Sequence, residues 1–238
     1  MTDEQVDLDR VWIGVATRVW TRPPGWFERL AGRLLRSPGL ARSLVTTPSL
    51  LVGWLVATVV VLGAGVAATV STGTALVPLL APALAGAGIC YAYGPGIDPA
   101  YELSRSMPLG DRMVLLVRGL CVFAANAVLG VAASAGAAAA AADGRATAGA
   151  VAVTFGWLVP MTAVCAVALA VATLTRSAPV GVGAGLAGWA LVVLAGMAST
   201  GRAATAVADT TWYVPYLAVA GFGVATVLYA TRVMKGSS

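Results

Sequence analysis

The feature that most constrains this chain is a series of long apolar stretches that follows a polar, basic N-terminal segment. A helix needs about 20 consecutive apolar residues to cross a bilayer, and residues 50–70 reach that length without one charged side chain. Only 11% of the 238 residues are charged, whereas a soluble domain carries about 25%. The chain is therefore predicted to be an all-α integral membrane protein with six transmembrane helices, at about residues 50–70, 75–93, 113–142, 148–174, 180–197 and 212–230.

The distribution of lysine and arginine predicts the orientation of these spans. Cytoplasmic loops carry an excess of these residues. With the N-terminus inside, thirteen of the fifteen lie on the inner side and two, Arg145 and Arg202, on the outer side. The prediction is a multi-pass plasma-membrane protein in which residues 1–48 and the tail 233–238 are cytoplasmic and residues 49–232 form one six-span domain. The net charge of +5 thus reflects topology, and no nucleic-acid partner is expected.

The N-terminal segment contains an amphipathic stretch, WFERLAGRLL, at residues 26–35. Glu28, Arg29 and Arg33 form its polar side, and its apolar side comprises Trp26, Phe27, Leu30, Leu34 and Leu35. Aromatic residues and leucines opposite arginines are typical of a helix that lies in the membrane interface. Packing of this helix on a cytoplasmic partner is the alternative.

The longest interior segment that carries charge is residues 97–118, between the second and third predicted spans. Asp98 is a favourable N-cap and Pro99 suits the first helical position, while Pro108 prevents the helix from continuing. Asp111 can cap the next helix. The short helix so defined carries an apolar face and off-face charges, and the residues with a predicted role are Asp98, Pro99, Tyr101, Glu102, Leu103, Arg105, Met107 and Pro108. It suits docking onto a cytoplasmic protein, although a capped loop that merely joins two spans fits the bare pattern equally well.

A few residues inside the spans invite a specific interpretation. Asn126 is the strongly polar interior residue of the third span, and we expect it to form a hydrogen bond between helices or, alternatively, to line a path. Gly181 and Gly185, continued by Gly188, form a face of small residues that allows close helix contact. Pro78 and Pro82 are expected to kink the second span, and Pro160 lies inside the fourth. Three cysteines in apolar runs (Cys90, Cys121 and Cys165) are interpreted as small core residues.

Several kinds of chemistry find no support in the sequence. The middle of each predicted span lacks Asp, Glu, Lys, Arg and His, which argues against proton relays and ion-coupled carriers. A carboxylate pair, a metal-ligand cluster and a GxxxxGK[ST] phosphate-binding loop are all missing. We therefore expect no catalytic site, metal or cofactor on this chain, and a transporter built from it would receive energy from another subunit.

The order of these features resembles the membrane subunit of ABC-2 type transporters, particularly the short actinobacterial type. A basic amphipathic helix (residues 26–35) precedes six spans, and DPAYELSRSMP (residues 98–108) followed by VLLVR (residues 114–118) joins spans two and three. The layout also resembles small permeases that confer immunity to peptide antibiotics. The family often has re-entrant helices between spans five and six, where this chain has only a short stretch.

This resemblance implies that residues 98–108 form the coupling helix that contacts a cytoplasmic ATPase subunit, and that residues 26–35 form the connecting helix. ATP and Mg²⁺ would then bind to that ATPase. A second permease copy, identical or different, would complete the path for an apolar or amphipathic substrate such as a lipid, hydrophobic antibiotic or peptide. The alternative is a non-transporting membrane scaffold or signalling partner that tethers a cytoplasmic protein through the same segment.

Overall fold

A computed structural model describes residues 25–35, 48–90, 111–141, 156–201, 203, 207 and 209–236. The chain divides into two compact units, Met1–Val45 and Thr46–Ser238, which are described separately. Within the described residues all regular secondary structure is helical, as an all-α membrane protein requires.

The described part of the first unit is a single helix, α2 (Trp26–Leu35), with the bounds predicted from the amphipathic pattern. Glu28 lies in its first turn and Arg33 in its last turn. Both charges oppose the partial charge of the nearer helix end, which favours the helix. The side chains of Arg29, Leu30 and Arg33 are exposed.

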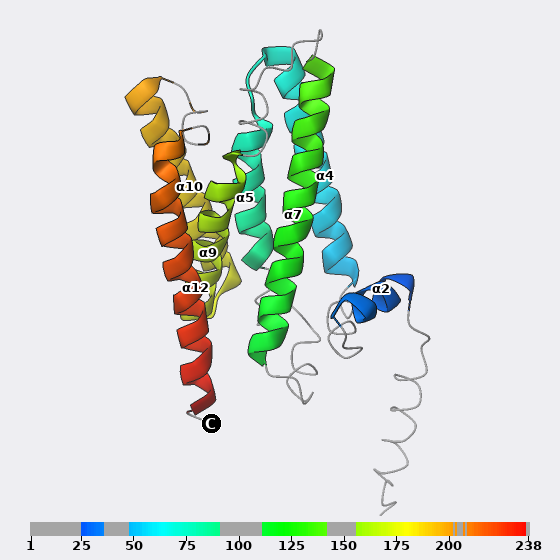
Figure 1. Ribbon diagram of the computed structural model, residues 1–238, viewed down its shortest axis with the longest axis vertical. Helices are drawn as coiled ribbons and strands as arrows, with labels where there is room; N and C mark the ends of the chain where they lie inside the picture. Colours follow the sequence, from blue (N-terminus) through cyan, green and yellow to red (C-terminus); the bar gives the residue numbers. More distant parts are fainter. Residues whose placement is uncertain are drawn as a thin grey trace, which may run out of the picture. The chain divides into compact units, whose positions relative to one another are not determined.

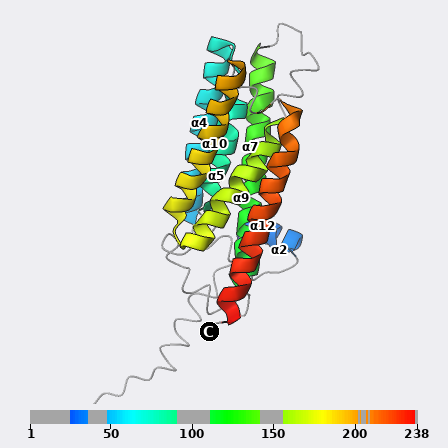
Figure 2. The same ribbon diagram turned by 90° about the vertical axis from the view of Figure 1, so that its left-hand side faces the viewer.

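The second unit is a bundle whose successive long helices run in alternating directions (Figures 1 and 2). The elements are α4 (Pro48–Thr72), α5 (Val77–Cys90), α7 (Asp111–Ala141), α9 (Leu158–Thr175), α10 (Ala178–Thr200), the 3₁₀ helix η2 (Thr210–Trp212) and α12 (Tyr213–Gly236). Five segments are long and apolar enough to cross a membrane, namely Gly53–Thr72, Leu115–Ala140, Leu158–Thr175, Ala178–Thr200 and Thr210–Arg232. The described helices are thus consistent with a helical membrane protein.

The second and fourth predicted spans differ most from the described helices. The described helix α5 has 14 residues, which at 1.5 Å per residue is about 21 Å and shorter than a bilayer core of about 30 Å. Helix α9 begins at Leu158, although the fourth span was expected from about residue 148. Residues 91–93 and 148–155 of these two predictions lie outside the described residues.

The prolines explain part of this difference. Pro160 is the third residue of α9 and Pro78 the second residue of α5. In a first helical turn the missing N–H costs nothing, because that position has no carbonyl to bond. Both prolines therefore lie near helix starts, so the kink expected at Pro78 does not arise there. Of the two prolines expected to kink the second span, Pro82 alone lies beyond the first turn of α5.

Two tight turns connect neighbouring helices. Gly73 follows α4 with φ +68, a left-handed conformation that glycine adopts without strain. Arg176 follows α9 with φ 54 and closes the helix, its N–H donating to the Ala172 carbonyl. Ser177 is the N-cap of α10, with a proline in the first turn. Helices α9 and α10 thus form a close antiparallel hairpin.

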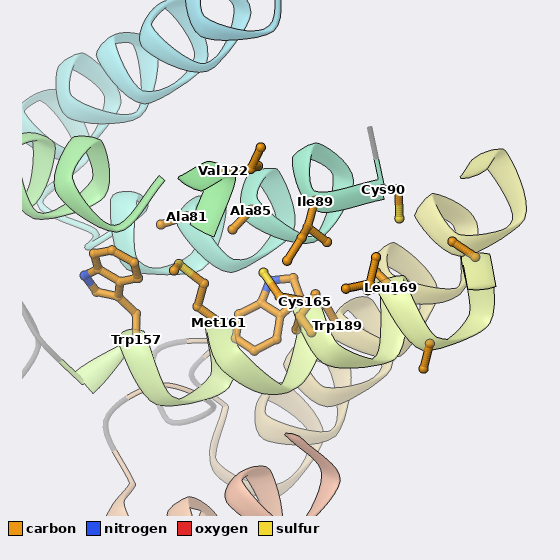
Figure 3. Packing of buried hydrophobic residues seen from close by; sticks show 14 of the residues in the cluster. Ala81, Ala85, Ile89, Cys90, Val122, Trp157, Met161, Cys165, Leu169 and Trp189 are labelled. Carbon is orange, nitrogen blue, oxygen red and sulfur yellow. The ribbon is translucent and has the colours of Figure 1, made fainter. Parts of the chain in front are cut away.

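Helix α9 is the centre of the bundle. In its span 61% of the residues are buried, against 17–28% in the other four. It packs against α5, α10 and α12, while α4 packs against α5 and α7. In Figure 3, Met161, Cys165 and Leu169 of α9 face Ala81, Ala85 and Ile89 of α5, and Trp189 of α10 belongs to the same cluster. The core is therefore built around an alanine-rich helix with few large side chains.

Glycines on the neighbouring helices allow this close packing. A Cβ at Gly181 of α10 would lie 2.6 Å from the Ala168 carbonyl oxygen, and one at Gly223 of α12 would lie 2.9 Å from Ala166 backbone atoms. Gly185 also faces α9, as predicted, but Gly188 has nothing within 4 Å. The small-residue face therefore ends at Gly185, because Gly188 lies on the outward side of α10.

The outer surface of the bundle is apolar. Phe222 and Val214 of α12 are 78% and 75% exposed, and Val60, Leu120 and Leu191 are each more than half exposed on three other helices. Large apolar side chains exposed on several helices are disfavoured in water and suit lipid. Cys121 is also exposed, which corrects its interpretation as a core residue, whereas Cys90 and Cys165 are buried.

Candidate functional site

The predicted coupling residues, Asp98, Pro99, Tyr101, Glu102, Leu103, Arg105, Met107 and Pro108, all lie outside the described residues. The two helices that hold this segment are described. α5 ends at Cys90 and α7 begins at Asp111, the predicted start of the next helix. A Cβ at Gly119 of α7 would lie 4.0 Å from the Ile89 side chain of α5. The end of α5 and the start of α7 therefore lie at the same end of one packed helix pair.

Basic residues gather at this end of the bundle. Arg112 and Arg118 belong to the first turns of α7, Arg176 lies in the turn between α9 and α10, and Arg232 and Lys235 are near the end of α12. Figures 1 and 2 show these helix ends on the same side of the second unit. The opposite end has no lysine or arginine among its described residues. The described bundle thus has the one-sided charge that the positive-inside rule associates with a cytoplasmic face.

The predicted interfacial residues lie on α2. Leu30 is 50% exposed, so its side chain is available to lipid or to a partner. Trp26, Phe27 and Leu34 lie on the same helix, and the structure describes only the backbone of these three residues. Whether α2 contacts lipid or protein stays a prediction.

Asn126 lies deep inside the bundle with 3% of its surface exposed. Its side-chain NH₂ donates to the Val122 carbonyl of the same helix at 2.9 Å, which is not the hydrogen bond between helices expected from the sequence. The amide oxygen Oδ1 is buried without a hydrogen-bond partner. The Trp54 indole nitrogen of α4 also lies beside Gly88 of α5, so three helices meet here.

Sequence reasoning missed the residues that continue this polar line. Gly130 and Ser134 follow Asn126 at intervals of four residues and are buried on the same face of α7. The Trp157 ring, just before α9, packs against Gly130. A polar or small residue at every fourth position of an otherwise apolar span was the available signal, but a chain rich in glycine and alanine conceals it.

One hydrogen bond does join two helices across the core. The Trp189 indole nitrogen of α10 donates to the Leu79 carbonyl of α5 at 2.8 Å. This bond fixes the indole orientation and ties α10 to α5 independently of side-chain packing. Trp189 is therefore a structural contact within the bundle.

The described residues contain no group of three His, Cys, Asp or Glu side chains that could hold a metal ion. The carboxylate of Asp209, between α10 and η2, accepts hydrogen bonds from the hydroxyl and backbone N–H of Thr211 at 2.7 and 2.9 Å. These bonds, the hydroxyl first, lower the pKa of Asp209 from its ordinary value. Asp209 thus caps η2 and begins the last transmembrane segment.

No protein-family model, no curated protein and no solved structure matches the chain. Function therefore has to be inferred from the chain's own residues and geometry.

Proposed function

We propose that this chain is the transmembrane permease subunit of an ATP-driven exporter of the ABC-2 type. The single observation that carries the proposal is that α5 ends and α7 begins at the same end of the bundle, where the basic residues gather. The charged segment 91–110 joins these two helices in the sequence. A helix tethered there would transmit movement of a bound protein directly to two helices of the membrane domain.

The energy source in this proposal is a separate cytoplasmic ATPase subunit, which binds ATP and Mg²⁺. The spans lack ionisable residues at their centres, so an ion gradient has no group to act on. The chain also lacks a phosphate-binding loop of its own. Mechanical coupling through residues 98–108 is the remaining route by which this membrane domain would be driven.

The proposed topology has six spans and both termini in the cytoplasm of a cell whose plasma membrane holds the protein. Five of these spans are the segments long enough to cross a membrane. The remaining one, second in chain order, contains α5, which would extend beyond Cys90. A second permease copy, identical or different, would complete the path, because the described bundle is filled by side chains around α9. Uncharged walls favour an apolar or amphipathic substrate such as a lipid, a hydrophobic antibiotic or a peptide.

A non-transporting scaffold is the second candidate, because the same tethered segment could hold a cytoplasmic regulator. Purification of the tagged protein from its own membrane in a mild detergent distinguishes the two. The exporter predicts a co-purifying subunit with a phosphate-binding loop, identified by mass spectrometry, and ATP hydrolysis in the purified fraction. Absence of both, with a regulatory protein bound instead, would favour the scaffold.

A further inference from the structure

Two arginines at the basic end of the bundle are exposed on neighbouring helices. Arg176 lies in the turn after α9 and Arg232 near the end of α12, and both side chains are exposed. Within the described residues, no hydrogen bond or ion pair engages either guanidinium. Arg118 on α7 differs, because it is half-buried and already interacts with another part of the protein. Arg176 and Arg232 are therefore available to a partner outside the described chain.

The packing of α9 against α12 places the two arginines at nearly the same level of the bundle. Both helices run toward the basic end (Figures 1 and 2), and they touch where Gly223 of α12 packs on Ala166 of α9. Arg176 and Arg232 each follow this contact by about ten residues, or about 15 Å at the helical rise. The axes of packed helices lie about 8–10 Å apart, so the two charges are neighbours at one end of this helix pair.

The last span indicates that this level coincides with the lipid headgroups. Trp212, which is 49% exposed, ends η2 about 20 residues before Arg232. That length of helix is about 30 Å, the thickness of one hydrocarbon core. Tyr229, one turn before Arg232, is 72% exposed. Tryptophan and tyrosine are enriched at the two membrane interfaces, so these rings mark the two boundaries and Arg232 lies just beyond one of them.

Exposed apolar side chains accompany both arginines on the side of the membrane core. Leu174 comes just before Arg176 and is 61% exposed, and Val180, in the first turn of α10, is 48% exposed. Tyr229 has the corresponding place beside Arg232. A water-soluble acidic protein could pair with the arginines, but it would leave these apolar side chains uncovered. A partner with a negative head and apolar chains covers both parts.

We propose that Arg176 and Arg232 bind the phosphate of an anionic phospholipid whose acyl chains lie against Leu174 and Tyr229. A guanidinium pairs with phosphate through two parallel N–H···O bonds. Charge complementarity favours such a lipid, because the described residues at this end include five basic residues and a single acidic one, Asp111. The cytoplasmic leaflet, which the basic end is predicted to face, is the anionic one. The site requires only that the bundle lies in a membrane, and it does not rest on the proposed transport function.

The test is native mass spectrometry of the full chain released from neutral detergent micelles, which resolves individual bound lipids. Phosphatidylglycerol and phosphatidylcholine with identical oleoyl chains are titrated separately, so that only the headgroup differs. The wild-type chain should bind its first phosphatidylglycerol at least about fivefold more tightly than its first phosphatidylcholine, the preference expected from one basic residue near an anionic headgroup.

Single variants locate the bound lipid. Arg176→Gln and Arg232→Gln should each weaken phosphatidylglycerol binding about fivefold and leave phosphatidylcholine binding unchanged, which also reports that the bundle stays folded. Arg202→Gln is the matched control, because it removes the same charge next to Gly201, where α10 ends at the opposite end of the bundle. The double variant Arg176→Lys, Arg232→Lys keeps both charges and should retain a preference for phosphatidylglycerol.

Three outcomes would contradict the proposal. Equal affinity of the wild-type chain for the two lipids would remove the lipid site and favour an acidic protein as the partner of this face. An equal loss in Arg202→Gln would show that the preference follows net charge and not these two residues. Glycerol 3-phosphate offers a phosphate without acyl chains, and its displacement of phosphatidylglycerol at equal concentration would indicate a site for free anions. None of these measurements involves ATP, so the exporter proposal can fail while the lipid site stands.

Discussion

Glycines of α10 and α12 that face α9 determine how closely these two helices approach it. Gly181, Gly185 and Gly223 each face alanines of α9 at distances that leave no room for a methyl group. In lipid there is little hydrophobic drive for helices to associate, so close van der Waals packing holds them together. Individual glycines therefore differ sharply in importance, although the sequence shows them as equivalent.

The pair Gly223 and Gly221 on α12 tests this difference. Gly223→Ala should destabilise the bundle by about 1–3 kcal/mol, because the new Cβ meets backbone atoms of Ala166. Gly221→Ala should be neutral or stabilising by up to about 1 kcal/mol, since that position is open and alanine favours helix. Unfolding by SDS titration in mixed micelles measures both. Equal effects of the two substitutions would show that Gly223 is not a packing contact.

Asp209 offers a second test at a single residue. Its lowered pKa means that the cap stabilises η2 above the carboxyl's unfolded pKa, and that this stability is lost as the pH falls through the lowered, folded pKa. Thr211→Val removes the hydroxyl that contributes most and should raise the pKa of Asp209 toward its ordinary value. NMR titration of the Asp209 carboxyl carbon measures this shift. An unchanged titration would mean that the Thr211 hydroxyl does not stabilise the carboxylate.

At the scale of elements, the predictions succeeded where a single physical cause fixes the helix. The amphipathic pattern correctly predicted the bounds of α2, and α7 begins at Asp111, the residue predicted to start it. Pro160 lies in the first turn of α9, whereas the sequence placed it inside a longer fourth span whose expected start, at about residue 148, lies outside the described residues. Proline suits both situations, so its place in a helix cannot be derived from an apolar run alone.

The amphipathic helix α2 gives a prediction that separates its two interpretations. Replacing Trp26, Phe27 and Leu30 with serine should weaken membrane seating or subunit assembly without removing the spans, because the apolar face would lose its lipid contact. Crosslinking between subunits and transport by the purified assembly measure the effect. Exchange of the exposed Arg29 for lysine is the control. Wild-type assembly and transport in the serine variant would show the interfacial interpretation to be wrong.

At the scale of the whole molecule, the sequence predicted the class of protein but not its core. Lipid forces each long apolar run into a helix, because backbone groups find no other partners there. The runs are apolar on every side, so no pattern reveals which face is buried or that α9 is central. Trp54 and Trp157 were missed for the same reason, since a tryptophan in an apolar run gives no sign that its indole packs against a glycine of another helix.

The topology is the first whole-molecule prediction. Reporter tags at residue 1, within residues 104–106 and at Ser238 should be protected inside the cell, and tags near Asp143 or Arg202 should be accessible from outside. The physical reason is the gathering of basic residues at one end of the described bundle. A tag at Asp143 that is inaccessible from outside would contradict the six-span topology.

The central claim is that a partner ATPase drives the bundle through residues 98–108. Tyr101 and Leu103 are the proposed aromatic and apolar anchors of that contact. Losing a central anchor typically costs about 2 kcal/mol, or about 30-fold in affinity. Val60→Ala on the exposed face of α4 is the matched truncation that should change neither membrane insertion nor coupling.

The most direct measurement is therefore ATPase capture and substrate transport by the Tyr101→Ala, Leu103→Ala double variant, compared with wild type and Val60→Ala. The account predicts that the double variant inserts normally but loses the ATPase, or retains it and hydrolyses ATP without transport. Normal capture together with normal transport in the double variant would contradict the account.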